Sequence, residues 1–240
     1  MLILLIDVIA VLFWLLILHK LNSYSGKNGY KIILKFYFAG LFSVAVVILL
    51  YKIFRLSYFE GRADDFSKIV NCIVIVGPVE EFSKFIVFAI LCANLKSIRD
   101  PRDGIILAAS VGLAFASVEN YLYGSEYGIR LIIIRSFLCI AGHMSFAAVW
   151  GFVYSCLICD KNSKGGHNDF FPVLEALLIA AFIHGLYDVF AEFRHFFLAV
   201  SLVLFTVGLT LYGYLYLKKK IQLAAAHRHP QMIRHGLSAR

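Results

Sequence analysis

Four groups of polar residues lie within long apolar stretches of this chain, and their types suit hydrolytic chemistry. They are Glu80-Glu81 with Lys84, Glu119-Asn120, His143, and His184 with Asp188. A charge at the centre of a membrane helix costs roughly 2.5–3.5 kcal/mol on insertion scales, so such residues are rare there. Several of them in one chain indicate that they act together. Carboxylates and imidazoles activate water and stabilise developing charge, so the pattern predicts a buried hydrolytic site.

The spacing within each group shows which side chains can cooperate. Lys84 lies one helical turn after Glu80 and Glu81 and can pair with either of them. Adjacent residues point about 100° apart around a helix, so one glutamate is expected to face the site while the other anchors a neighbouring helix. His184 and Asp188 share one helix face, where Asp188 can orient the imidazole or hold a shared water or metal.

Each group also has a purely structural interpretation. Glu81 and Lys84 can form an ion pair that joins two helices. Asn120 or His143 can form a hydrogen bond between helices. We assign Glu119 to the site, because it is the costlier member of its pair to bury, and Asn120 to a supporting role. Three further ionisable residues are left out of the predicted site because they lie near the ends of their apolar runs: Asp7, Arg135 and Glu175.

The elements that carry these groups are predicted to be membrane helices. The 240 residues are 61% hydrophobic with a mean hydropathy of +0.81, whereas soluble domains are about 45–50% apolar. The apolar runs are about 20 residues long and do not alternate, which favours helices over a barrel. We therefore predict an all-α, polytopic transmembrane bundle with a polar intramembrane cavity and about seven spans, at 2–18, 33–54, 69–93, 104–122, 131–158, 171–192 and 196–216.

The net charge of +8 is explained by membrane orientation and does not indicate nucleic-acid binding. Lys and Arg are concentrated around 19–35, 95–103, 159–170 and 217–240, which predicts a plasma-membrane protein with its N-terminus outside and its C-terminus in the cytoplasm. The polar groups then fall in the outer half of the bilayer. The chain divides into two N-terminal spans (1–60), a core that carries the motifs (66–192), a final span (193–217) and a basic tail (218–240). The five cysteines lie in or beside spans, which argues against a disulfide framework.

In this order along the chain, the four motifs over residues 66–192 resemble the PrsW family of intramembrane proteases. The resemblance implies that Glu80 is the general base, that His143, His184 and Asp188 bind water or stabilise the oxyanion, and that Glu81 and Lys84 support the site. It also implies a bacterial source and a membrane-anchored substrate of the anti-sigma-factor class. Related prenyl endopeptidases carry Asn at the position of Asp188, and this difference favours the PrsW branch and disfavours a prenylated substrate.

Three questions stay open at the level of sequence. The first is metal dependence. No His-Glu-x-x-His motif is present, so we favour a glutamate mechanism without a cofactor, but Glu80, His143, His184 and Asp188 could also hold Zn²⁺. The second is whether the chain is instead a proton-coupled or ion transporter, since chains of Glu and His also form ion pathways. The third is whether the chain is a non-catalytic scaffold or immunity protein, in which the same groups only join helices.

Overall fold

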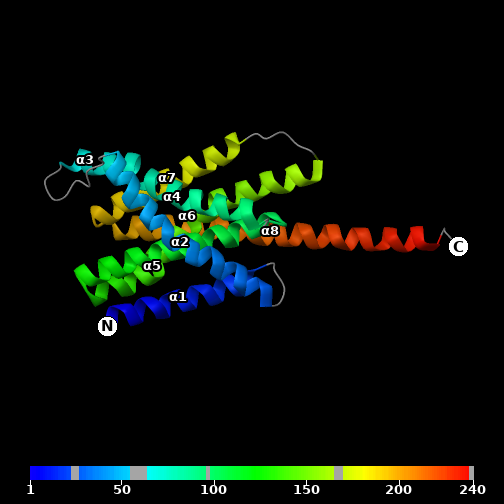
Figure 1. Ribbon diagram of the computed structural model, residues 1–240, viewed down its shortest axis with the longest axis horizontal. Coiled ribbons are helices and arrows are strands. Elements are labelled where there is room, and N and C mark those ends of the chain that lie inside the picture. The colour runs from blue at the N-terminus through cyan, green and yellow to red at the C-terminus, as the bar shows by residue number, and fades with distance from the viewer. Residues whose placement is uncertain (23–26, 55–63, 96–97, 165–169, 238–240) are drawn as a thin grey trace.

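A computed structural model describes residues 1–22, 27–54, 64–95, 98–164 and 170–237, and within them the fold is all-α, as predicted. Figure 1 shows the arrangement of the helices. In chain order they are α1 (Leu2–Leu21), α2 (Lys27–Ile53), α3 (Asp65–Val70), the π-helix η1 (Asn71–Val76), α4 (Gly77–Leu95), α5 (Pro101–Tyr127), α6 (Ile129–Lys164), α7 (Phe171–Glu192) and α8 (Phe196–Leu237).

Among the described residues, six helices are long and apolar enough to cross a membrane, namely α1, α2, α5, α6, α7 and α8. The remaining predicted span, 69–93, corresponds to η1 and α4. It differs from the other six because Glu80, Glu81 and Lys84 place three charges in the first half of α4. The helix α6 continues through Gly142 without a break, so the long fifth span is one element.

Local sequence explains how α5 and α6 become antiparallel neighbours. Asp100 caps α5, where its side chain and that of Asp103 form a capping box, and Pro101 occupies the first turn. At the other end, Gly128 has φ of 91°, a conformation that favours glycine and turns the chain directly into α6. This tight connection brings the end of α5, with Glu119, beside the start of α6.

The helix α5 lies at the centre of the bundle and packs against α1, α2, α4, α6 and α8. Its residues from Asp103 to Ser117 are all buried. A second packing centre is aromatic: Phe36 of α2, Phe88 of α4 and Trp150 of α6 are fully buried, with ring centroids 5.7 Å (Phe36–Phe88) and 5.1 Å (Phe88–Trp150) apart. These contacts fix α4 against α6, which positions the charged first half of α4.

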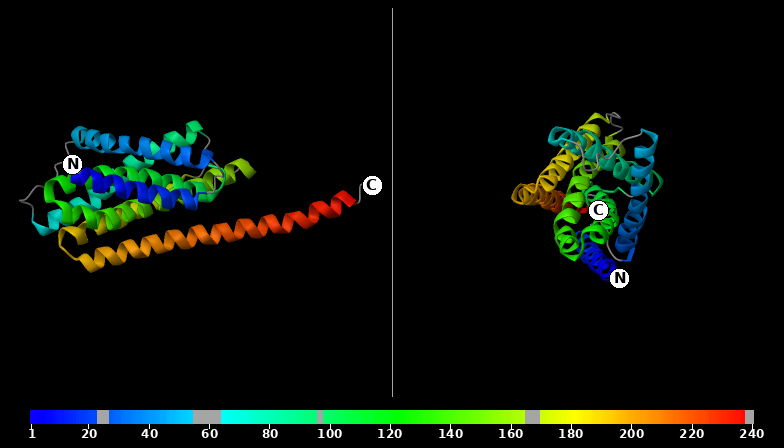
Figure 2. Two further views of the ribbon diagram at one scale, coloured as in Figure 1. Left: turned by 90° about the horizontal axis from the view of Figure 1, so that it is seen from below. Right: turned by 90° about the vertical axis from the view of Figure 1, so that its left-hand side faces the viewer.

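The last helix does not end where the final span was expected to end. Figures 1 and 2 show α8 running along one side of the bundle and continuing past it. Residues of the predicted tail, 218–240, belong to this helix as far as Leu237. The side chains from 220 onward lie outside the described part of the structure. They include the basic and histidine residues at 227–229, 234 and 235.

Candidate active site

The structure brings the four predicted groups into one buried network. Helix α4 contributes Glu80, Glu81 and Lys84, and α5 contributes Glu119 and Asn120. Helix α6 contributes His143, while α7 contributes His184 and Asp188. Each of these eight side chains lies within 3.6 Å of at least one other member of the network or of Arg135, as the distances below show.

Lys84 occupies the middle of the network and its side chain is fully buried. Its Nζ lies 2.7 Å from Glu81 Oε1 and 3.0 Å from His143 Nδ1, and it lies 4.2 Å from the centre of the Phe115 ring. Because an ammonium group only donates hydrogen bonds, His143 Nδ1 must accept. The other ring nitrogen of His143 then carries the proton and donates to Glu119 Oε2 at 2.9 Å. Both ring nitrogens of His143 are therefore engaged.

The two adjacent glutamates have different surroundings. Glu81 is fully buried, accepts hydrogen bonds from Lys84 and from Trp150 Nε1 (2.9 Å), and lies 3.0 Å from His184 Nδ1. The Glu80 side chain keeps 12% of its surface exposed, and its Oε2 has no hydrogen-bond partner among the described residues. That oxygen lies 3.6 Å from Lys84 Nζ and 3.6 Å from His184 Nε2. Glu81 is held by hydrogen bonds from its neighbours, whereas the buried Oε2 of Glu80 accepts none from the described residues.

His184 stands between the glutamates and Asp188. Its Nε2 lies 3.6 Å from Asp188 Oδ2, which is an electrostatic contact and longer than a hydrogen bond. The ring stacks on Phe146 with centroids 5.3 Å apart and stands nearly perpendicular to His143 at 4.8 Å. Asp188 and Glu119 are 25% and 22% exposed, so the network is accessible from the side on which these two carboxylates lie.

Arg135, which the sequence analysis left out, belongs to the network. Its guanidinium group forms an ion pair with Glu119 Oε2 at 2.8 Å, donates a hydrogen bond from Nε to Asn120 Oδ1 at 3.2 Å, and lies over the ring of Tyr123. Its position near the end of an apolar run was the reason for leaving it out, and that position does not keep it from the network. Its cation compensates for the burial of the Glu119 carboxylate.

Two other side chains that were not assigned to the site are also buried. Trp150 is fully buried and donates to Glu81, and it lies seven residues after His143 on the same face of α6. Asp7 is buried in the bundle. Glu175 is exposed on α7, as expected for a residue outside the site.

Glycines let the helices approach closely enough to build the network. A Cβ on Gly185 would lie only 2.5 Å from the carbonyl oxygen of Cys72 in η1, so only glycine permits this close approach. On the facing helix, a Cβ on Gly77 would overlap the carbonyl oxygen of Ala181. Helix α7 therefore packs backbone to backbone against η1 and the start of α4, and this contact places His184 beside Glu80 and Glu81.

The comparisons with known proteins agree on one family. The family model for PrsW family intramembrane metalloproteases matches residues 29–213. A protein named Protease PrsW from Shouchella clausii is 28% identical over 199 residues, which is 82% of this chain and 87% of that protein. Protease PrsW from Clostridioides difficile is 25% identical over 180 residues, 73% of each chain. No solved structure gives a significant match.

The family description raises the question of whether these residues fit a metal ion. Ligand atoms of Glu80, His143 and His184 lie within 4.8 Å of one another, and two imidazoles with one carboxylate are a common catalytic zinc set. Glu80 Oε2 is buried without a hydrogen-bond partner and is available as a ligand, whereas His184 Nδ1 faces Glu81 Oε1 at 3.0 Å. The donor set therefore fits a metal. Asp188, which was included in the predicted metal set, is not part of this group, and Lys84 competes for His143.

Proposed function

Because the chain belongs to the PrsW family of intramembrane proteases, we propose that it hydrolyses a peptide bond of a membrane-anchored protein at the network around Glu80. The observation that carries this proposal is the Glu80 carboxylate, which has an unpartnered oxygen next to two histidines inside a bundle of membrane helices. A carboxylate that nothing else saturates can take a proton from water, whereas Glu81 is fully engaged and cannot.

In the proposed reaction, Glu80 accepts a proton from a water molecule as the water oxygen attacks the scissile carbonyl carbon. The same proton then passes from Glu80 to the leaving amine nitrogen when the carbon–nitrogen bond breaks. His184 donates to the oxyanion, and the buried ammonium of Lys84 stabilises the negative charge at close range. His143, fixed by Glu119 and Lys84, keeps that ammonium in place.

A bound metal ion would be held by Glu80, His143 and His184, and it would supply Lewis acidity to the water and the carbonyl oxygen. The competition with Lys84 makes the glutamate mechanism our preferred form. The substrate that we propose is a protein with a single membrane span, of the anti-sigma-factor class, which approaches the network from the exposed side of Glu119 and Asp188.

Co-expression with tagged single-span proteins, anti-sigma factors among them, tests this function. We expect the wild type to release fragments, and Glu80→Gln and His143→Ala to lower the rate by about 10²- to 10⁴-fold. Glu175→Gln is the matched control, because Glu175 is exposed and lies outside the network. Absence of fragments from the wild type with every candidate, or full cleavage by Glu80→Gln, would contradict the proposal.

A chelator decides between the two forms of the mechanism. Cleavage by the purified enzyme that survives prolonged treatment with 1,10-phenanthroline supports the glutamate form. Loss of cleavage that is restored by added Zn²⁺ supports the metal form.

If the folded wild type cleaves nothing, ion uptake into proteoliposomes tests the alternative functions. Uptake that depends on Glu80 would support a transporter, and absence of uptake would support a scaffold.

A further inference from the structure

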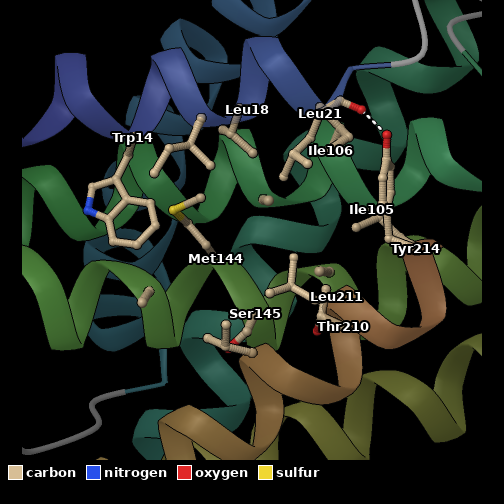
Figure 3. Close-up of a pocket in the computed structure, with 15 residues that line it drawn as sticks. Trp14, Leu18, Leu21, Ile105, Ile106, Met144, Ser145, Thr210, Leu211 and Tyr214 are labelled. Atoms are coloured by element: carbon tan, nitrogen blue, oxygen red, sulfur yellow. Dashed lines mark hydrogen bonds between the residues drawn. The ribbon is translucent and has the colours of Figure 1, made fainter.

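We infer that an apolar pocket between α1, α5, α6 and α8 binds an acyl chain of an anionic membrane phospholipid. This pocket has a volume of about 340 Å³ and lies on the side of α6 away from the polar network. Figure 3 shows side chains of the four helices pointing into one common space, with Trp14 at one end and Tyr214 at the other. The inference does not depend on protease activity.

The lining of the pocket selects an apolar ligand. No charged residue lines it, and its three hydroxyl-bearing residues all have partners. Ser145 bonds the Gly142 carbonyl, Thr210 bonds the Thr206 carbonyl, and Tyr214 reaches across to the carbonyl of Leu21 (Figure 3). With no polar group left to hold water, such a space stays dry and favours hydrocarbon.

The surroundings of the pocket identify the hydrocarbon as a lipid chain. All four lining helices are among the six long, apolar ones. The pocket is not sealed, because Leu211 in its wall is 43% exposed and Trp14 is partly exposed. Helices α1 and α8 both pack on α5 and α6, and the Tyr214–Leu21 hydrogen bond joins them at one end. An opening toward the bilayer core admits the acyl chains that surround the protein.

Basic residues at the Tyr214 end favour an anionic headgroup. His19 and Lys20 occupy the last turn of α1 and are exposed. Lys218 follows Tyr214 by one turn of α8, and Lys219 comes next, both exposed. Arg102 at the start of α5 lies nearby but is already paired with Asp100. The lysines are therefore the groups that can attract a phosphate at the membrane surface, while the acyl chain enters the pocket below.

Trp14 provides an internal probe for this site. The chain has two tryptophans, and the other, Trp150, is fully buried in the aromatic core. In vesicles of phosphatidylcholine, we expect a low mole fraction of phosphatidylglycerol with brominated acyl chains to quench tryptophan fluorescence strongly. The same fraction of brominated phosphatidylcholine should quench weakly. Trp14→Phe should remove the difference between the two lipids.

Matched variants separate the pocket from the general lipid surface. Val207→Phe narrows the pocket and should abolish the preference, whereas Leu209→Phe, on the exposed side of the same helix, should leave it unchanged. The surface double variant Lys20→Gln/Lys218→Gln keeps the core intact and should raise the half-quenching mole fraction by about tenfold or more. Equal quenching by both lipids, or a preference that survives Val207→Phe, would overturn the inference.

Discussion

Lys84 connects the two halves of the polar network, because its buried ammonium lies between Glu81 on its own helix and His143 on α6. A buried charge is tolerated only when partners compensate for the loss of water. Glu81 provides that compensation and is itself bonded by Trp150. Glu80 is only 3.6 Å away and contributes less to holding the lysine, so the adjacent glutamates divide into one structural and one reactive group.

This division predicts different effects of the same substitution at the two positions. Glu81→Gln should lower the free energy of unfolding by about 3–5 kcal/mol, because it leaves the Lys84 charge uncompensated. Glu80→Gln should change stability much less while lowering the rate of cleavage by about 10²- to 10⁴-fold. Thermal unfolding of both variants in the same detergent measures the difference. Equal destabilisation would show that both glutamates hold Lys84.

Arg135 is predicted to act through Glu119 as a positioning residue. Arg135→Met should lower kcat by about 10- to 100-fold with little change in KM, since Glu119 then loses the cation that fixes it against His143. Arg135→Lys should recover part of the rate, because it still pairs with Glu119. Arg130→Met, at an exposed position on the same helix, is the control. An unchanged kcat in Arg135→Met would exclude the positioning role.

Among the elements, α7 and the η1–α4 segment determine the geometry of the site. The π-helix η1 directly precedes the charged part of α4, and Gly185 of α7 packs against its backbone. Outside the spans, Lys68 of α3 donates to Glu192 at the end of α7 over 2.9 Å, and this hydrogen bond raises the pKa of Lys68. Helix α7 therefore contacts this part of the chain at two levels, through the buried glycine contact with η1 and through the exposed ion pair with α3.

The glycine contact can be tested by adding a single methyl group. Gly185→Ala should destabilise the protein by about 1–3 kcal/mol and reduce cleavage, because the new Cβ lies 2.5 Å from the Cys72 carbonyl oxygen and pushes His184 away from α4. Gly208→Ala on α8 is the control, since a Cβ there has no neighbour within 4 Å. Unfolding and cleavage assays on both variants check this. Equal behaviour of the two variants would rule out a role for the close contact.

For the whole molecule, the distribution of charge predicts the direction in which the bundle crosses the membrane. Basic residues flank the end at which α1 and α8 meet, and the accessible carboxylates of the network lie toward the opposite ends of α5 and α7. The positive-inside rule then places Glu119 and Asp188 toward the outer surface and the projecting part of α8 in the cytoplasm. A substrate would accordingly reach the site from outside.

Cysteine labelling of intact cells tests this orientation. Glu126→Cys, at the exposed end of α5, should react with a membrane-impermeant maleimide. Lys219→Cys, on the exposed surface of α8, should react only after the cells are permeabilised. The wild type serves as the background control for its five native cysteines. The reverse labelling pattern would invert the predicted topology and place the site in the inner half of the bilayer.

The sequence by itself determined the fold class, the approximate bounds of most spans and eight of the side chains that meet. Long apolar runs specify membrane helices regardless of their neighbours, and ionisable residues within them stand out because lipid makes them costly. The predicted bounds of α7, 171–192, are those observed, since Pro172 and the apolar run define them locally.

Only the tertiary structure decided how those side chains share their roles. Helical periodicity gives the face on which a residue lies but not the helix that packs against that face. The roles of Glu80 and Glu81, the inclusion of Arg135 and the bond from Trp150 to Glu81 all depend on contacts between helices, which join residues 16 to 104 positions apart in the chain. Burial and hydrogen bonding between helices, which no local pattern contains, made those distinctions.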